Sequence, residues 1–86
     1  MELKKLIKSI SKDIEILDSY TKKSFYGVDI EYVAFKIGNF YYLASKDIFY
    51  VITEQTPDRS QDISPATVFR RKGFIEYIKR LLILEN

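Results

Sequence analysis

The residues able to carry chemistry in this chain of 86 residues are limited by two absences, because the sequence contains neither Cys nor His. Disulfides, thiolate or imidazole metal sites and Cys or Ser/His nucleophiles are therefore excluded. What remains is a basic run, Arg70, Arg71 and Lys72, with Tyr77 a few positions further on. Arginine can stabilise charge on a phosphodiester while Tyr, Lys or Glu transfers a proton. These residues are the candidate set for a histidine-free ribonuclease.

A set of this kind resembles the one used by small mRNA-cleaving toxins of the RelE type. The resemblance implies phosphodiester cleavage by a small protein, and it is the third hypothesis for this chain. The predicted order of elements differs, since this chain begins with a helix where those toxins begin with a strand.

The same basic run supports an alternative hypothesis, nucleic-acid binding without catalysis, with a second basic stripe on the first predicted helix. The formal net charge is only +2, and residues 24–54 hold more acidic than basic side chains. That charge is too small for generic coating of DNA, so binding would depend on the clusters. The candidate nucleic-acid contacts are Lys4, Lys8, Lys12, Arg70, Arg71 and Lys72.

Metal and cofactor chemistry has little support in the sequence. Asp29 and Glu31 point the same way from a predicted strand, but two carboxylates alone make a poor cation site. The three glycines, Gly27, Gly38 and Gly73, are scattered and form no phosphate-binding loop. We therefore expect no metal, no cofactor and no small-molecule substrate.

The elements that position these residues follow from apolar periodicity. Spacings of three and four residues predict helices over 2–20 and 74–84. Alternating β-branched and aromatic residues predict three antiparallel strands, at 29–37, 40–45 and 48–53.

Turn chemistry connects these strands. Gly38-Asn39 predicts a type II′ hairpin turn, and Lys46-Asp47 predicts the next one. Residues 54–64 have the composition of a flexible polar loop, and 65–72 fit either a helical turn or a short fourth strand. The chain is expected to be one α+β domain of order α-β-β-β-α, with both helices on one face of a three-stranded sheet.

The two hairpin registers sort side chains onto opposite faces of that sheet. Phenylalanines fall on one predicted face and most strand tyrosines on the other, and tyrosine favours sites where its hydroxyl stays wet. We predict that the phenylalanine face forms the core and that the tyrosine face is open; the alternative is one helix on each face. The predicted partner-binding residues are Tyr32, Tyr41, Leu43, Tyr50 and Ile52.

An open face rich in tyrosine and poor in charge has the composition of an interface. The leading hypothesis is a small non-enzymatic binding or regulatory protein that associates with itself as a homodimer, or with a protein partner. Abundant Ile, Lys, Tyr and Phe suggest A/T-rich coding and a phage- or plasmid-encoded regulator or inhibitor. The first ten residues lack an uninterrupted apolar run, so a cytoplasmic protein with no membrane association is expected.

Overall fold

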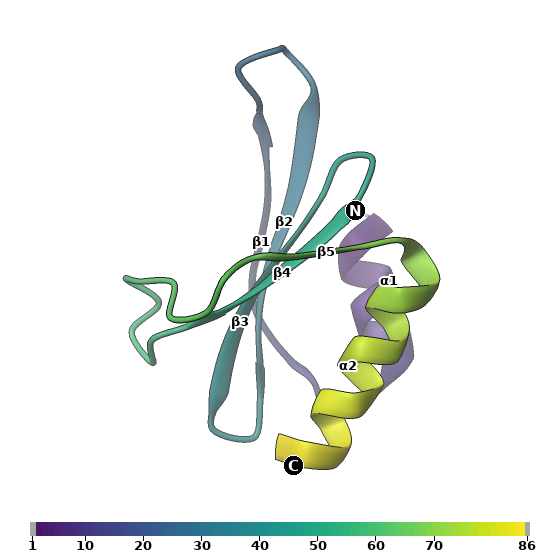
Figure 1. The fold of residues 1–86 in the computed structure, drawn as a ribbon, viewed down its shortest axis with the longest axis vertical. Helices are drawn as coiled ribbons and strands as arrows, with labels where there is room; N and C mark the ends of the chain where they lie inside the picture. The colour runs from purple at the N-terminus through teal and green to yellow at the C-terminus, as the bar shows by residue number, and fades with distance from the viewer. Residues whose placement is uncertain (1, 86) are drawn as a thin grey trace.

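The computed structural model describes residues 2–85 and shows an α+β fold with a five-stranded antiparallel sheet and two helices (Figure 1). The strands are neighbours in chain order, so the sheet is a simple meander. No helix in the described part is both long and apolar enough to cross a membrane. The elements are α1 Glu2–Ile10, β1 Glu15–Lys23, β2 Asp29–Ile37, β3 Phe40–Lys46, β4 Tyr50–Gln55, β5 Thr67–Phe69 and α2 Arg71–Glu85.

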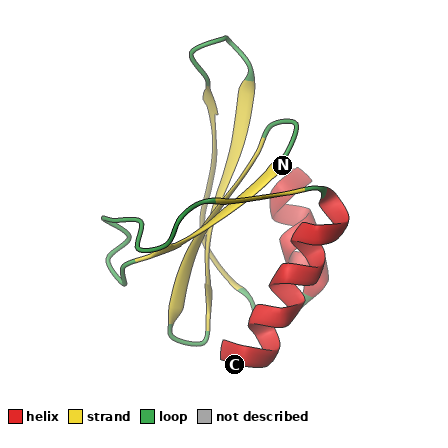
Figure 2. Ribbon diagram, viewed as in Figure 1, coloured by secondary structure: helices red, strands yellow, loops and turns green. Residues whose placement is uncertain are grey.

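Both helices pack on the same face of the sheet, as predicted from the sequence, and none of residues 2–85 forms a helix on the opposite face (Figure 2). The core lies between the helices and the sheet. Its largest fully buried side chains come from both layers: Phe35, Phe74, Leu3, Ile7, Ile37, Ile52, Ile78 and Val33.

The predicted helix over 2–20 is wrong beyond Ile10, because the chain turns and then forms β1. In the turn, the Ser11 hydroxyl oxygen accepts the backbone N–H of Asp13 at 3.0 Å. β1 contains a bulge between Ile16 and Asp18, which places an extra residue in the strand. The error arises because Ile14 and Leu17 continue the helical spacing of the apolar residues in α1, although Ile14 precedes β1 and Leu17 is unpaired at the bulge.

α1 is tied to the sheet at its first turn. The Glu31 carboxylate of β2 accepts the backbone N–H groups of Glu2 and Leu3, each at 3.1 Å. It therefore supplies the capping acceptor that the helix start needs, and its charge is favourable at that end of the helix. Lys46 of β3 adds an ion pair to Glu2 at 3.1 Å.

The Gly38-Asn39 turn is confirmed, with Ile37 paired to Phe40. Gly38 has φ 59° and Asn39 has no positive φ, as in a type II′ turn. Gly27 likewise has φ 80° in the β1–β2 turn, where the Ser24 carbonyl accepts its N–H at 2.9 Å. Phe25 in this turn is almost fully exposed.

The predicted β3–β4 register is wrong. The turn holds three residues, because the Asp47 carboxylate accepts the backbone N–H groups of Ile48 and Phe49. Lys46 therefore pairs with Tyr50, where a two-residue turn would pair Ser45 with Ile48. The odd offset reverses both faces of β4.

Residues 65–72 contain the short strand β5, the fourth-strand alternative predicted there, which pairs with β4; together with β1 it raises the predicted three strands to five. α2 begins at Arg71, three residues before the predicted start at residue 74, and continues through Gly73. The earlier start is tolerated because Arg71 is the first residue of the helix and its side chain remains exposed. A Cβ added at Gly73 would lie 3.4 Å from the ring of Phe69, an ordinary van der Waals contact.

Candidate partner-binding face

The face of the sheet opposite the helices is the main candidate site, and we call it the open face. Antiparallel pairing determines its members, because directly paired residues share a face. β1, β2 and β3 contribute most of it, with fewer residues from β4 and β5. The open face consists of Glu15, Asp18, Tyr20, Lys22, Ile30, Tyr32, Ala34, Lys36, Tyr41, Leu43, Ser45, Val51, Thr53, Gln55 and Val68.

Tyrosines organise the open face. Tyr20 and Tyr32 are directly paired across β1 and β2, and their rings stack with centroids 5.1 Å apart and an interplanar angle of 13°. The Lys22 ammonium lies 5.3 Å from the centre of the Tyr20 ring. On β3, the Tyr41 ring has Lys36 at 5.5 Å. The rings are thus held in place by their neighbours before any partner binds, which lowers the entropy cost of association.

A hollow of about 270 Å³ lies on this face, where the β4–β5 loop approaches the sheet. Ala34 and Leu43 provide apolar lining, while Asp18 and Gln55 are among the polar lining residues. The hollow therefore combines an apolar surface with polar groups, as ligand and side-chain pockets usually do. Its full lining is Asp18, Tyr20, Ala34, Leu43, Gln55, Asp58 and Arg59.

The β4–β5 loop was predicted to be flexible, and the structure shows a hydrogen-bonded turn within it. The Asp58 carboxylate accepts the Thr56 hydroxyl at 2.6 Å and both the N–H and hydroxyl of Ser60. These donors favour the charged form, led by the Thr56 hydroxyl, and lower the pKa of Asp58 to about 2. Arg59, at the tip, adopts φ 62°, which this turn requires of it.

Formal charges on the open face cancel. Lys22 and Lys36 are balanced by Glu15 and Asp18, and the loop adds one acid and one base beside the hollow. Glu15 is the direct cross-strand partner of Lys36. A surface without net charge gives phosphate no long-range attraction.

The predicted partner-binding residues divide between the two faces. Tyr32, Tyr41 and Leu43 lie half-buried on the open face. The reversed register of β4 places Tyr50 and Ile52 beneath the helices, where they are only 7% and 2% exposed. Their predicted position on the open face is wrong.

Tyr20 is absent from the predicted partner-binding residues because residues 2–20 were predicted to form a helix. The run Ser19-Tyr20-Thr21 carried a signal, since Tyr and Thr favour strands over helices. Val51 is absent from the predicted partner-binding residues, and the observed β3–β4 register places it on the open face as well.

The basic residues proposed for nucleic acid occupy the helix side. Arg70 precedes α2, and Arg71 and Lys72 begin it, all with exposed side chains. Lys8 is exposed on α1. Lys4 is half-buried there, and Lys12 lies beyond the end of that helix, so the predicted three-lysine stripe is wrong at Lys12.

The candidate ribonuclease set is spread around α2. Tyr77 lies six residues after Arg71, about 120° around the helix. Its ring packs against Phe69 with centroids 5.0 Å apart, at the margin of the core.

The two carboxylates considered for a metal have separate partners. Asp29 pairs with Lys23 at 3.3 Å, whereas Glu31 caps α1. Within residues 2–85, no cluster of three or more acidic side chains could hold a cation.

No protein family, curated protein or solved structure matches this chain. Its function must be argued from its own surfaces.

Proposed function

We propose that this protein is a small binding protein that associates with a second copy of itself through the open face. The observation that carries the proposal is the placement of both helices on one side of the sheet (Figure 1). That placement leaves the stacked tyrosines, together with Leu43 and Val51, without a covering layer. Contiguous aromatic and aliphatic side chains on a sheet face are characteristic of interfaces.

The charge balance favours a protein partner over a nucleic acid. Phosphate binding draws on excess Lys and Arg, and the open face has none. Lys22 and Lys36 lie over tyrosine rings, and Lys36 is also the cross-strand partner of Glu15. These neighbours offset part of the free energy that it costs to remove the lysine charges from water when another protein surface covers the face.

The same balance favours a second copy as that partner. In a two-fold dimer the same patch meets itself, so bases of one copy can face acids of the other. The molecule extends 37 × 27 × 20 Å, and Figure 1 shows the sheet nearly edge-on along the longest axis. A face bounded by the longest and the shortest of these extents, 37 and 20 Å, approaches in area the roughly 800 Å² that each partner buries in a stable interface.

The test is the mass of the protein in solution across a range of concentrations, measured by light scattering or sedimentation. The unaltered protein should show twice the mass of one chain at high concentration. Leu43→Asp places a charge at the centre of the open face and should produce a monomer. Tyr41→Lys, at the second position of β3, should also produce a monomer, with less risk to folding.

Ile83→Asp is the matched control, because Ile83 is 80% exposed on α2, away from the open face. It should leave the mass unchanged. A monomeric unaltered protein at every concentration would refute the proposal. Dissociation by Ile83→Asp and not by Leu43→Asp would place the contact on the helix side instead.

A further inference from the structure

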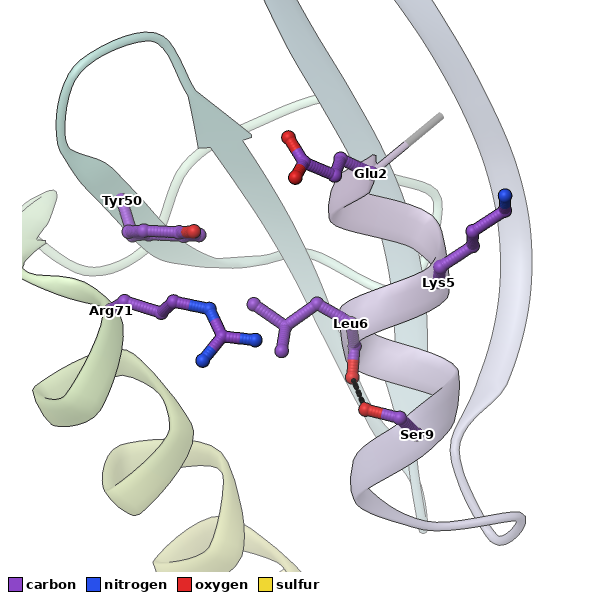
Figure 3. Close-up of a pocket in the computed structure, with 6 residues that line it drawn as sticks. All are labelled: Glu2, Lys5, Leu6, Ser9, Tyr50 and Arg71. Carbon is purple, nitrogen blue, oxygen red and sulfur yellow. Dashed lines mark hydrogen bonds between the residues drawn. The ribbon is translucent and has the colours of Figure 1, made fainter.

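A second pocket lies on the helix side, away from the open face, and Figure 3 shows it between α1, α2 and β4. Its volume is about 260 Å³, slightly below the usual range for drug-sized ligands. It therefore suits a small ligand or one group of a larger molecule. Its lining is Glu2, Lys5, Leu6, Ser9, Tyr50 and Arg71.

Tyr50 gives this pocket an unpartnered polar group. Its ring is 7% exposed and packs on Phe74 with centroids 5.0 Å apart. Its hydroxyl points into the pocket in Figure 3 and forms no hydrogen bond to another residue within 2–85. The Lys46 ammonium lies over its ring, 5.5 Å from the ring centre. Polar atoms that are fully buried in residues 2–85 all have partners, so this hydroxyl is reached through the pocket.

Arg71 supplies positive charge on the same side of the pocket as that hydroxyl. Its guanidinium extends across the pocket towards Leu6, whereas the Lys5 side chain on the facing helix points away from both (Figure 3). Neither cation forms an ion pair with the described residues. The Arg71 guanidinium therefore keeps N–H donors that an anion in the pocket could accept.

The other polar groups of the pocket are already engaged. Glu2, the acid in the lining, pairs with Lys46 at 3.1 Å, so its charge is largely balanced. That contact, first through its hydrogen bond and then through charge, lowers the pKa of Glu2. The Ser9 hydroxyl donates to the Leu6 carbonyl at 2.6 Å, which leaves the Ser9 oxygen as an acceptor.

We propose that this pocket binds a phosphate-class anion. The Tyr50 hydroxyl and the Arg71 fork donate hydrogen bonds to its oxygens, while Lys5, whose side chain points away from both in Figure 3, adds only long-range attraction. Arginine matches a tetrahedral oxyanion with two parallel N–H donors, which a lysine cannot provide. The site lies on the opposite side of the sheet from the proposed dimer contact, so either can fail without the other.

The experiment is an NMR titration of the full chain with inorganic phosphate at low ionic strength, beside a chloride titration at matched ionic strength. Phosphate should shift the amide signals of Lys5, Ser9 and Arg71, and chloride should not. Tyr50→Phe removes only the hydroxyl and should weaken binding about tenfold, since a hydrogen bond to an anion is worth this much. Arg71→Ala should weaken it at least as much.

Two further variants sharpen the test. Glu2→Gln removes the one negative group of the lining and should tighten phosphate binding a few-fold. Lys79→Ala removes a positive charge from α2, the helix that carries Arg71, but Lys79 does not line this pocket. This variant should leave the affinity for phosphate unchanged. Equal losses for Lys79→Ala and Arg71→Ala, unchanged affinity in Tyr50→Phe, or equal shifts with chloride would each overturn the proposal.

A second titration with a short oligothymidylate distinguishes the source of the phosphate. Tighter binding than inorganic phosphate, lost in Arg71→Ala, would assign the pocket to a phosphodiester backbone. Binding of inorganic phosphate alone would assign it to a free phosphate or a phosphate monoester. Binding of neither probe refutes the site.

Discussion

At the scale of single residues, burial of an aromatic ring in this protein depends on its place in the register more than on its type. Tyr50 is in the core and Phe49, its neighbour, is half exposed. Tyrosine tolerates this position because the ring packs against Phe74 while the hydroxyl reaches the pocket between the helices. The expectation that tyrosines face outward was therefore correct for Tyr32 and Tyr41 and wrong for Tyr50.

Two identical substitutions test this assignment. Tyr50→Ser should lower the free energy of unfolding by about 3 kcal/mol or more, because it leaves a cavity beside Phe74. Tyr41→Ser, on the half-buried open face, should cost about 1 kcal/mol. Urea denaturation at a protein concentration too low for self-association gives both values. The reverse order of the two effects would contradict the β3–β4 register.

Asp58 provides a pH-dependent residue. Its folded pKa of about 2 lies below the ordinary value of 3.8, so its hydrogen bonds contribute fully above pH 3.8. That contribution is lost as pH falls through about 2. The amide signals of Ser60 should therefore shift over this acid range, while amides in the centre of β2 serve as the internal reference. Asp58→Asn should remove the Ser60 transition, and its persistence in that variant would exclude Asp58 as the cause.

At the scale of elements, the parts of the fold that could be predicted are those specified by neighbouring residues. The hairpin of β2 and β3 follows from Gly38-Asn39 and from strict alternation on both sides. The apolar face of α2 follows from its spacing, apart from its first turn. β1 could not be recognised because Ile14 and Leu17 continue the helical spacing of α1 beyond its end, and the register of β4 was decided by hydrogen bonds to the Asp47 side chain.

Substituting alanine at two glycines should change the free energy of unfolding in opposite directions. Gly73→Ala should raise the free energy of unfolding by roughly 0.5 kcal/mol, since Ala favours a helix and its Cβ meets the Phe69 ring at 3.4 Å. Gly27→Ala should lower it by about 1 kcal/mol. Space is available at Gly27, with nothing within 4 Å, but its φ of 80° strains any L side chain. Thermal or urea unfolding of both variants checks the two signs, and a loss in Gly73→Ala would show that Phe69 cannot adjust.

At the scale of the whole molecule, the layers explain which site residues were predictable. Placement of both helices on one face followed from the pattern of apolar strand residues, and with it the existence of an open face. The pocket lined by residues of α1 and by Arg71 could not be predicted, because Lys5 and Arg71 lie 66 positions apart and line one pocket only once α1 and α2 are side by side. No local sequence pattern specifies that arrangement.

The packing of α1 and α2 from distant parts of the chain has a consequence for synthesis on the ribosome. The strands can pair one hairpin at a time as the chain leaves the ribosome, because each strand pairs with the one before it. The apolar face of that sheet, which includes Phe35, is covered only in part by α1 until residues 71–85 have left the exit tunnel. The nascent chain is therefore most prone to aggregation, and most dependent on chaperones, in the interval before α2 packs on the sheet.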